Sequence, residues 1–268
     1  MRLCGQPGNF GPYPDWASGK RLIRLAVELG VNFIDTAHAY GPGWNEALIG
    51  EALSGFTNDV VVATKGGVEK TAADNVFPDG RPSQLRLRCE ESLQSLRLER
   101  IDLYQLHRPD PKVPFAESVG ALAELRDEGK IRHVGLSNVC LAQVQEALNI
   151  VPIASVQNRF NLAEQSDSDV LEFCHTHGIA YLPWGPLAAK PFSPEAPLVG
   201  DARLTKIARS HSSTGGQIAL AWLLQRSANV VLIPGTTSET HLKQNMLVGQ
   251  IGLSTAESTI LRSLSKGL

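Results

Sequence analysis

Two stretches decide the kind of fold: DVVVATK at Asp59–Lys65 and IDLYQLH at Ile101–His107. Each is a short, almost continuous apolar run. Strands of this kind have both faces covered, as they do in a parallel sheet. The segment between the two stretches has the 3.6-residue apolar spacing of a helix. Together they predict a strand, a crossover helix and a second parallel strand.

The same alternation extends over the rest of the chain. The expected strands are Asn32–Ala37, Asp59–Lys65, Ile101–His107, Ile131–Ser137, Ile153–Asn158, Ile179–Trp184 and Asn229–Pro234. Helical patterns lie between them, and a further one, at about Ser18–Leu29, precedes the first strand. Alternation of strands and helices implies right-handed crossovers and an α/β fold.

Two α/β architectures fit this pattern: an open doubly wound sheet and a closed (β/α)8 barrel. A dinucleotide-binding open sheet would carry GxGxxG after a strand, and the sequence has no such motif. A closed barrel needs eight strands and only seven are found, so the missing strand would precede the helix at Ser18–Leu29. That segment is rich in Gly and Pro and does not resemble a strand. No linker divides the chain, which predicts one domain over residues 1–268.

Composition narrows the class of protein. The 268 residues are 43% hydrophobic and 19% charged, with a net charge of −2. This composition excludes a disordered chain and offers no positive field for nucleic acid. No apolar run reaches the roughly 20 residues of a membrane helix, and the N-terminus lacks the apolar region of a signal peptide. The four cysteines form no CxxC pair and His175 and His177 diverge, so we expect a cytoplasmic protein without a metal site.

Polar side chains recur where the expected strands end, which is where α/β barrels build their active sites. They are Asp35 with Tyr40 in the loop that follows, Lys65, His107, Ser137, Asn138, Gln157 and Trp184, and then Gly235, Thr236 and Thr237. Each alone could be an ordinary turn residue. A barrel, however, would direct all of them toward one mouth.

Four of these residues, Tyr40, Lys65, Asp35 and His107, suit proton transfer. A free phenol has a pKa near 10, and a nearby ammonium lowers it. Asp35 can keep Lys65 charged, and His107 can align the reacting oxygen. Such a set suits protonation of a carbonyl oxygen while hydride arrives at carbon, and the hydride would have to come from a nicotinamide.

The ordered motifs resemble those of the aldo-keto reductase superfamily, with wording closest to its bacterial members. They are GVNFIDTAHAYG (30–41), VVVATKGG (60–67), LYQLHRPD (103–110), VGLSN (134–138), VQNRFN (156–161) and IPGTTSETHLKQN (233–245). The resemblance covers about Asp15 to Asn245. It implies a (β/α)8 barrel and the NADPH-dependent reduction of aldehydes or ketones, with Tyr40 as general acid supported by Asp35, Lys65 and His107.

The resemblance also implies a cofactor site. Ser137, Asn138 and Gln157 would bind the nicotinamide carboxamide, Trp184 would stack on its ring, and Gly185 and Leu187 would lie beside it. At the far end of the cofactor, the residues implied are Gly235, Thr236, Thr237, His241, Gln244 and Asn245. Many members have Lys where this chain has Gly235 and Arg where it has His241, which weakens the expected preference for NADP over NAD.

Members of this superfamily normally begin with a short Gly-rich strand, which in this chain would lie upstream of Met1. We therefore expect the strand that bears Asp35 to be the first one.

Two other functions stay open. Lys65 could form a Schiff base, as in barrel lyases of the aldolase kind, or the protein could be a non-catalytic NADP-binding regulatory subunit. The sequence names neither the carbonyl substrate nor the oligomeric state.

Overall fold

The computed structural model describes residues 3–56, 60–187 and 201–264. The chain divides into two compact units. The first unit comprises Met1–Val156 with Gly235–Glu239, and the second unit comprises Gln157–Pro234 with Thr240–Leu268. That the whole chain is one domain stays a prediction.

Strands and helices alternate through the first unit. Its elements are α1 (Trp16–Glu28), β1 (Phe33–Asp35), α2 (Trp44–Leu53), β2 (Val61–Gly66), β3 (Val68–Lys70), β4 (Val76–Pro78), α3 (Pro82–Leu96), β5 (Ile101–Leu106), α4 (Phe115–Asp127), β6 (Ile131–Ser137), α5 (Leu141–Leu148) and β7 (Ile153–Gln157). The antiparallel hairpin β3–β4 lies in a segment for which the sequence predicted no strand. The other strands of this unit fall where the sequence placed them, although β1 is shorter.

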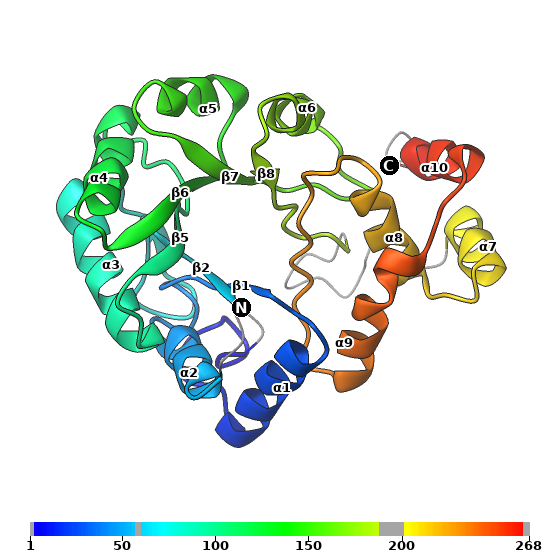
Figure 1. The fold of residues 1–268 in the computed structure, drawn as a ribbon, viewed down its shortest axis with the longest axis horizontal. Helices are drawn as coiled ribbons and strands as arrows, with labels where there is room; N and C mark the ends of the chain where they lie inside the picture. Colours follow the sequence, from blue (N-terminus) through cyan, green and yellow to red (C-terminus); the bar gives the residue numbers. More distant parts are fainter. Residues whose placement is uncertain (1–2, 57–59, 188–200, 265–268) are drawn as a thin grey trace. The chain divides into compact units, whose positions relative to one another are not determined.

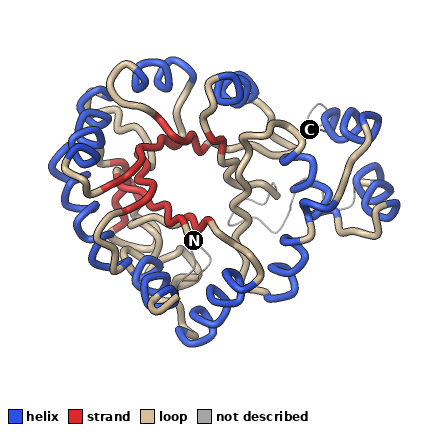
Figure 2. The backbone as a smooth tube through the Cα atoms, viewed as in Figure 1, coloured by secondary structure: helices blue, strands red, loops and turns tan. Residues whose placement is uncertain are grey.

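The strands of the main sheet follow the order β1-β2-β5-β6-β7-β8. The pairs β1–β2, β2–β5 and β5–β6 are parallel, and their register places Asp35 opposite Ala63 and Lys65 opposite Gln105. In the first unit, helices α2, α3, α4 and α5 lie on the outer side of these strands (Figure 1; strands red and helices blue in Figure 2). Asp35, Lys65 and His107 consequently lie at or just beyond the carboxyl ends of neighbouring strands.

Burial explains why these runs form strands. On β5, Ile101, Tyr104 and Leu106 are fully buried, and on β6 Val134 and Leu136 are as well. Apolar runs of this kind contribute about 25 cal/mol per Å² of apolar surface removed from water. Lys65 is also fully buried although it is cationic. A buried lysine needs a paired opposite charge, so an anionic partner is expected next to it.

The second unit is mostly helical. Its elements are α6 (Ser168–Thr176), β8 (Ala180–Tyr181), α7 (Ala202–Ser210), α8 (Gly215–Leu224), most of α9 (Glu239–Met246), the 3-10 helix η1 (Val248–Gln250) and α10 (Thr255–Arg262). Thr214 begins α8 with a capping box, in which its hydroxyl oxygen accepts the Gln217 N–H.

The last two expected strands were largely wrong. The strand expected at Ile179–Trp184 is reduced to β8, because Pro183 has no N–H to donate to a ladder. Trp184 forms only an isolated bridge, with Arg159. In Asn229–Pro234, only Val230 forms a bridge, with Tyr181. The residues that follow it are only partly buried, so little apolar burial supports a longer strand there.

Among the described residues, β1 is the first strand, as expected, and the segment before α1 forms turns. The sheet order runs from β1 to β8 through six strands, so the described residues do not form a closed barrel. The sequence predicted a (β/α)8 barrel without its first strand, and the described sheet likewise has no strand before β1. No helix in the described ranges is long and apolar enough to cross a membrane.

Candidate active site

Tyr40 lies in a tight loop that follows β1. The Tyr40 N–H donates to Ala37 O at 3.0 Å, and the Gly43 N–H donates to His38 O at 2.8 Å. Gly41 has a φ of 70°, a left-handed conformation that favours glycine. A Cβ at Gly41 would also lie 2.6 Å from a backbone oxygen of the N-terminal segment. The loop therefore holds the half-buried Tyr40 close to the carboxyl end of β1.

The ammonium of Lys65 is the centre of a buried polar cluster. Its Nζ donates to Asp35 Oδ2 at 2.7 Å and to Thr36 O, also at 2.7 Å. Gln105 on β5 donates from Nε2 to the other Asp35 carboxylate oxygen, Oδ1, at 3.2 Å. The Lys65 side chain is fully buried and that of Asp35 is 9% exposed. A buried charge needs an opposite charge and hydrogen bonds, and Lys65 has both.

The same ammonium contacts the phenol of Tyr40. The Lys65 Nζ lies over the Tyr40 ring, 5.1 Å from its centroid, and the two side chains influence each other's pKa. Burial opposes the charge on Lys65, but Asp35 and Tyr40 outweigh burial and raise the Lys65 pKa above its ordinary value. Burial raises the pKa of Tyr40, and the positive charge of Lys65 opposes that rise. Lys65 is therefore an ammonium and Tyr40 a protonated phenol near neutral pH.

His107 faces the ring of Tyr40. The two ring centroids are 5.8 Å apart, with the planes at 84°. Among the described residues, His107 Nδ1 is a buried atom without a hydrogen-bond partner. Burial lowers the pKa of His107 well below its ordinary value, and the positive charges of Lys65 and Arg108 lower it further. The imidazole is therefore neutral, and it can donate one hydrogen bond without bringing a charge to the site.

Two of the expected cofactor residues lie beside His107. Ser137 ends β6 and is buried. Asn138 follows with a φ of 57°, a conformation in which its Nδ2 donates to His107 O and to Ser137 Oγ, each at 3.0 Å. The hydroxyl and amide groups at the end of β6 are thus next to the predicted catalytic residues.

Three further expected cofactor residues belong to the first unit. They lie in Gly235–Glu239, the short segment of that unit that follows Pro234 of the second unit. Gly235 and Thr237 are exposed and Thr236 is half-buried. The Ser238 N–H donates to Thr236 Oγ1 at 3.0 Å, which forms a turn just before α9. This turn places hydroxyl groups ahead of a helix N-terminus, where anions bind readily.

In the second unit, Gln157 and Trp184 lie on adjoining segments. Gln157 is buried at the end of β7. The Trp184 N–H donates to Asn158 O at 2.9 Å, and Arg159 lies 5.3 Å from the Trp184 ring centroid. Trp184 is only half-buried, unlike an ordinary core aromatic. Its neighbour Gly185 accepts a hydrogen bond from Asn161 Nδ2 at 3.0 Å. Leu187, two residues on, is 40% exposed.

The remaining expected cofactor residues lie on α9. His241 is exposed, whereas Gln244 and Asn245 are half-buried. The Gln244 carbonyl accepts a hydrogen bond from Gln217 Nε2 at 3.0 Å, which ties α9 to α8 within the second unit. The structure thus brings Tyr40, Asp35, Lys65 and His107 together in the first unit with Ser137 and Asn138. The second unit contains Gln157, Trp184, Gly185, Leu187, His241, Gln244 and Asn245.

Sequence reasoning missed Gln105, which holds Asp35 from the side opposite Lys65. A signal was present, because Gln105 and His107 are two residues apart on a strand and so face the same side. It also missed the pair His38 and Glu46, which no periodicity connects.

Comparisons with known proteins identify the family of this chain. The family model "Aldo/keto reductase family" matches residues 8–266. An uncharacterized oxidoreductase of Schizosaccharomyces pombe is 43% identical over 254 residues, which cover 95% of this chain and 81% of the relative. Pyridoxine 4-dehydrogenase of Escherichia coli is 37% identical over 272 residues, covering 99% of this chain and 93% of the relative.

Solved structures give the same result. The thermostable aldo-keto reductase Tm1743, in complex with the inhibitor epalrestat, is 33% identical with a TM-score of 0.83, covering 96% of this chain and 90% of its own. An aldo-keto reductase of Klebsiella pneumoniae in complex with NADPH is 28% identical with a TM-score of 0.82, covering 97% and 88%. On the match to the family model and the identity to these relatives, the chain belongs to the aldo/keto reductase family.

Proposed function

We propose that this protein reduces aldehydes or ketones to alcohols, with Tyr40 as the general acid and a nicotinamide cofactor as the hydride donor. The observation that carries the proposal is the fully buried Lys65 ammonium, which Asp35 binds at 2.7 Å and which contacts the Tyr40 phenol. When a phenol gives up its proton, an adjacent ammonium stabilises the phenolate that forms. The site is built for that change of charge.

Each residue has a distinct part in the proposed proton transfer. The Tyr40 hydroxyl donates its proton to the carbonyl oxygen of the substrate. His107, kept neutral by burial, donates a hydrogen bond to the same oxygen and orients the carbonyl. Asp35 and Gln105 do not touch the substrate but hold Lys65 charged and in place. When bound, the nicotinamide supplies the hydride that the carbonyl carbon receives.

The residues present fit a nicotinamide. Hydroxyl and amide groups, which match the neutral carboxamide of the cofactor, end β6 and β7 at Ser137, Asn138 and Gln157. The half-buried Trp184 offers a ring face for stacking, with Gly185 and Leu187 beside it. The Klebsiella pneumoniae relative was solved with NADPH, which supports the same cofactor here.

We propose NADPH as the cofactor, with a smaller preference over NADH than is usual. Gly235, Thr236 and Thr237 would lie at the phosphates, and Gln244 and Asn245 at the adenine. Where many family members have an Arg, this chain has His241, whose imidazole is exposed. An imidazole lacks the bidentate fork with which Arg binds phosphate, so the 2′-phosphate should gain less affinity.

We also propose that the chain works as a single (β/α)8-barrel domain, as implied by the aldo-keto reductases that it resembles. Its four cysteines form no disulfide, which suits the reducing cytoplasm.

Small aromatic aldehydes are the first substrate class to test. Trp44, the first residue of α2, and Phe77, on β4, are 48% and 41% exposed, and one relative is a pyridoxine 4-dehydrogenase.

The test is NADPH oxidation in the presence of pyridoxal, benzaldehyde and small aliphatic aldehydes, repeated with NADH. We expect Tyr40→Phe to retain NADPH affinity and to lower turnover by about 10²-fold or more, the usual scale for a positioned acid. Tyr13→Phe is the matched control, because Tyr13 is a half-buried phenol of the same unit outside the cluster. Near-normal turnover in Tyr40→Phe would remove Tyr40 from the mechanism.

Two outcomes would favour the other functions. A covalent Lys65 adduct after borohydride treatment with a carbonyl compound would indicate a Schiff-base lyase, a role that needs a neutral amine and that the raised Lys65 pKa disfavours. NADPH binding without reduction of any aldehyde in the panel would indicate a regulatory subunit.

A further inference from the structure

A second buried polar cluster lies on the opposite face of β2 from Lys65. Successive residues of a strand point to opposite faces, so Thr64 points toward the helices. Its hydroxyl donates to Oε1 of Glu46 on α2 at 2.5 Å. Glu46 is fully buried, and its other oxygen, Oε2, has no hydrogen-bond partner among the described residues. A buried carboxylate with one unpaired oxygen would be costly.

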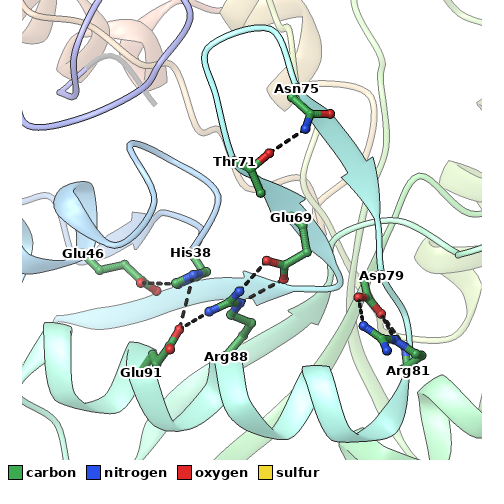
Figure 3. A network of polar contacts seen from close by, with 9 residues as sticks. All are labelled: His38, Glu46, Glu69, Thr71, Asn75, Asp79, Arg81, Arg88 and Glu91. Atoms are coloured by element: carbon green, nitrogen blue, oxygen red, sulfur yellow. Dashed lines mark hydrogen bonds and ion pairs between the residues drawn. The ribbon is translucent and has the colours of Figure 1, made fainter.

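The unpaired oxygen faces His38, two residues before Tyr40 in the loop after β1. Figure 3 shows the His38 ring between Glu46 and Glu91 of α3. His38 Nδ1 lies 3.7 Å from Glu46 Oε2, and His38 Nε2 lies 3.5 Å from Glu91 Oε2. Like Glu46 Oε2, His38 Nδ1 is buried and has no hydrogen-bond partner within the described ranges. Two unpaired buried atoms thus face each other.

The far side of His38 determines which ring nitrogen bears hydrogen. Glu91 Oε2 accepts a hydrogen bond from an Arg88 nitrogen at 2.5 Å, and the same guanidinium binds both carboxylate oxygens of Glu69 on β3, at 2.9 and 2.5 Å. Beside this guanidinium, Glu91 is an ionised acceptor. His38 must then donate from Nε2, and a neutral imidazole has only one N–H. Its Nδ1 therefore presents a lone pair to Glu46.

We propose that Glu46 is protonated in the working enzyme, donates a hydrogen bond from Oε2 to His38 Nδ1, and is a positioning residue for Tyr40. The inference rests on the proposed role of Tyr40. It accounts for both unpaired atoms with one shared proton and adds no charge to the buried cluster. Glu46 would lose this function on becoming a carboxylate.

The surroundings favour the proton on Glu46 rather than on His38. Burial raises the pKa of Glu46 to about 7. Burial, with the positive charge of Arg88, lowers the pKa of His38 to about 4. The titratable and charged groups around this pair come from β2, β3, α3, β5 and the residue after β5. They are Lys65, Glu69, Arg88, Cys89, Glu91, Tyr104 and His107. Lys65 is the cation among them that favours an ionised Glu46, and Glu91 opposes it.

The backbone of His38 transmits the contact to Tyr40. The His38 N–H donates to Lys65 O at 3.2 Å, and its carbonyl accepts the Gly43 N–H at 2.8 Å, so His38 is one end of the turn that contains Tyr40. If Glu46 ionises, His38 has two options. With hydrogen on Nε2 it still donates to Glu91, but its Nδ1 lone pair then faces the Glu46 carboxylate. With hydrogen on Nδ1 it donates to Glu46, but its Nε2 lone pair then faces the Glu91 carboxylate. Either way the ring loses one of its two contacts. A shift of about 1 Å in a reacting group can cost about 10²-fold in rate.

The pH dependence of turnover tests the proposal. In Glu46→Gln, the amide NH₂ replaces the acid proton and the amide oxygen still accepts from Thr64, so the variant is a permanent copy of the protonated state. We expect wild-type kcat to fall by about fivefold or more between pH 6 and pH 8.5, and that of Glu46→Gln to fall by less than about twofold. Glu51→Gln, on the exposed side of the same helix, is the control and should keep the wild-type profile. An unchanged profile in Glu46→Gln would overturn the proposal.

A second measurement is independent of activity. The difference between the infrared spectra of the wild-type protein and Glu46→Gln should contain a protonated-carboxyl band at pH 6 that shifts in D₂O and disappears by pH 8.5. The difference is needed because burial also raises the pKa of Asp167, to about 6. If this band is found but no aldehyde is reduced, the buried acid stands and the proposed function fails. Absence of the band at pH 6 would contradict the proposal even in an active enzyme.

Discussion

Lys65 and Thr64 are neighbours on β2, yet the clusters around them differ in charge. On the Lys65 side, an ammonium and a carboxylate form an ion pair at 2.7 Å, and Gln105 and Thr36 supply further hydrogen bonds. On the Thr64 side, Glu46 and His38 face each other at 3.7 Å, and both are neutral in the arrangement that we infer. Both clusters are buried, so burial alone does not decide ionisation.

The number of hydrogen bonds explains the difference. Each Asp35 oxygen accepts a hydrogen bond, from Lys65 or from Gln105, and these offset the loss of water. Of the Glu46 oxygens, Oε1 accepts from the Thr64 hydroxyl, and Oε2 faces a ring that has a lone pair to offer. The Thr64 and Ser92 hydroxyls lower the Glu46 pKa, but burial outweighs both. A buried pair therefore stays charged where every charged atom is hydrogen-bonded and becomes neutral where one is not.

Removing the ammonium should have the largest effect on this contrast. Lys65→Met leaves Asp35 buried without its counter-charge, and breaking a buried pair in this way costs about 3–5 kcal/mol. We expect the free energy of unfolding in urea to fall by that amount and aldehyde reduction to be lost. Lys20→Met is the control, since the Lys20–Glu51 pair is one-third exposed and such pairs contribute about 0–1 kcal/mol. Equal losses in the two variants would contradict the charged state of the Lys65 cluster.

The neutral cluster predicts a smaller, pH-dependent effect. The pKa of Glu46 is raised from its ordinary 4.5 to about 7 in the folded chain, so the folded state holds the proton more tightly. Its contribution to stability is present below pH 4.5 and is lost as the pH rises to about 7. Unfolding of wild type and Glu46→Gln, measured in urea from pH 4.5 to pH 8, should show the variant gaining about 3 kcal/mol relative to wild type. A constant difference would mean that Glu46 is ionised throughout.

The smallest expected effect comes from the amide that supports Asp35. Gln105 is fully buried, and Gln105→Leu removes one neutral donor from a carboxylate that keeps its ion pair. We expect a loss of about 1–3 kcal/mol in the free energy of unfolding. Turnover should fall less than in Lys65→Met. Gln94→Leu, at an exposed position of α3, is the control. A loss as large as that of Lys65→Met would show that hydrogen bonding, rather than charge, holds Asp35.

Much of the fold could be predicted because its signal is local. The strands around Lys65, His107 and Ser137 are continuous apolar runs, and such runs keep their structure in any compact parallel sheet. The hairpin β3–β4 and the strands near the end of the chain could not be predicted in the same way. Pairing, not propensity, decides whether short segments such as Val68–Lys70 or Asn229–Pro234 become strands.

The sequence by itself determined the order of the elements, the first strand at Asp35 and the set of side chains at the strand ends. These follow from periodicity and from the shared edge of parallel strands. Tertiary structure alone decided that Gln105 completes the Asp35 cluster, that His38 faces Glu46, and which of the buried acids are paired. The reason is that a protonation state depends on burial and on the neighbours that packing brings within a few ångströms, and residues such as Glu46 and Glu91 share no spacing that sequence could reveal.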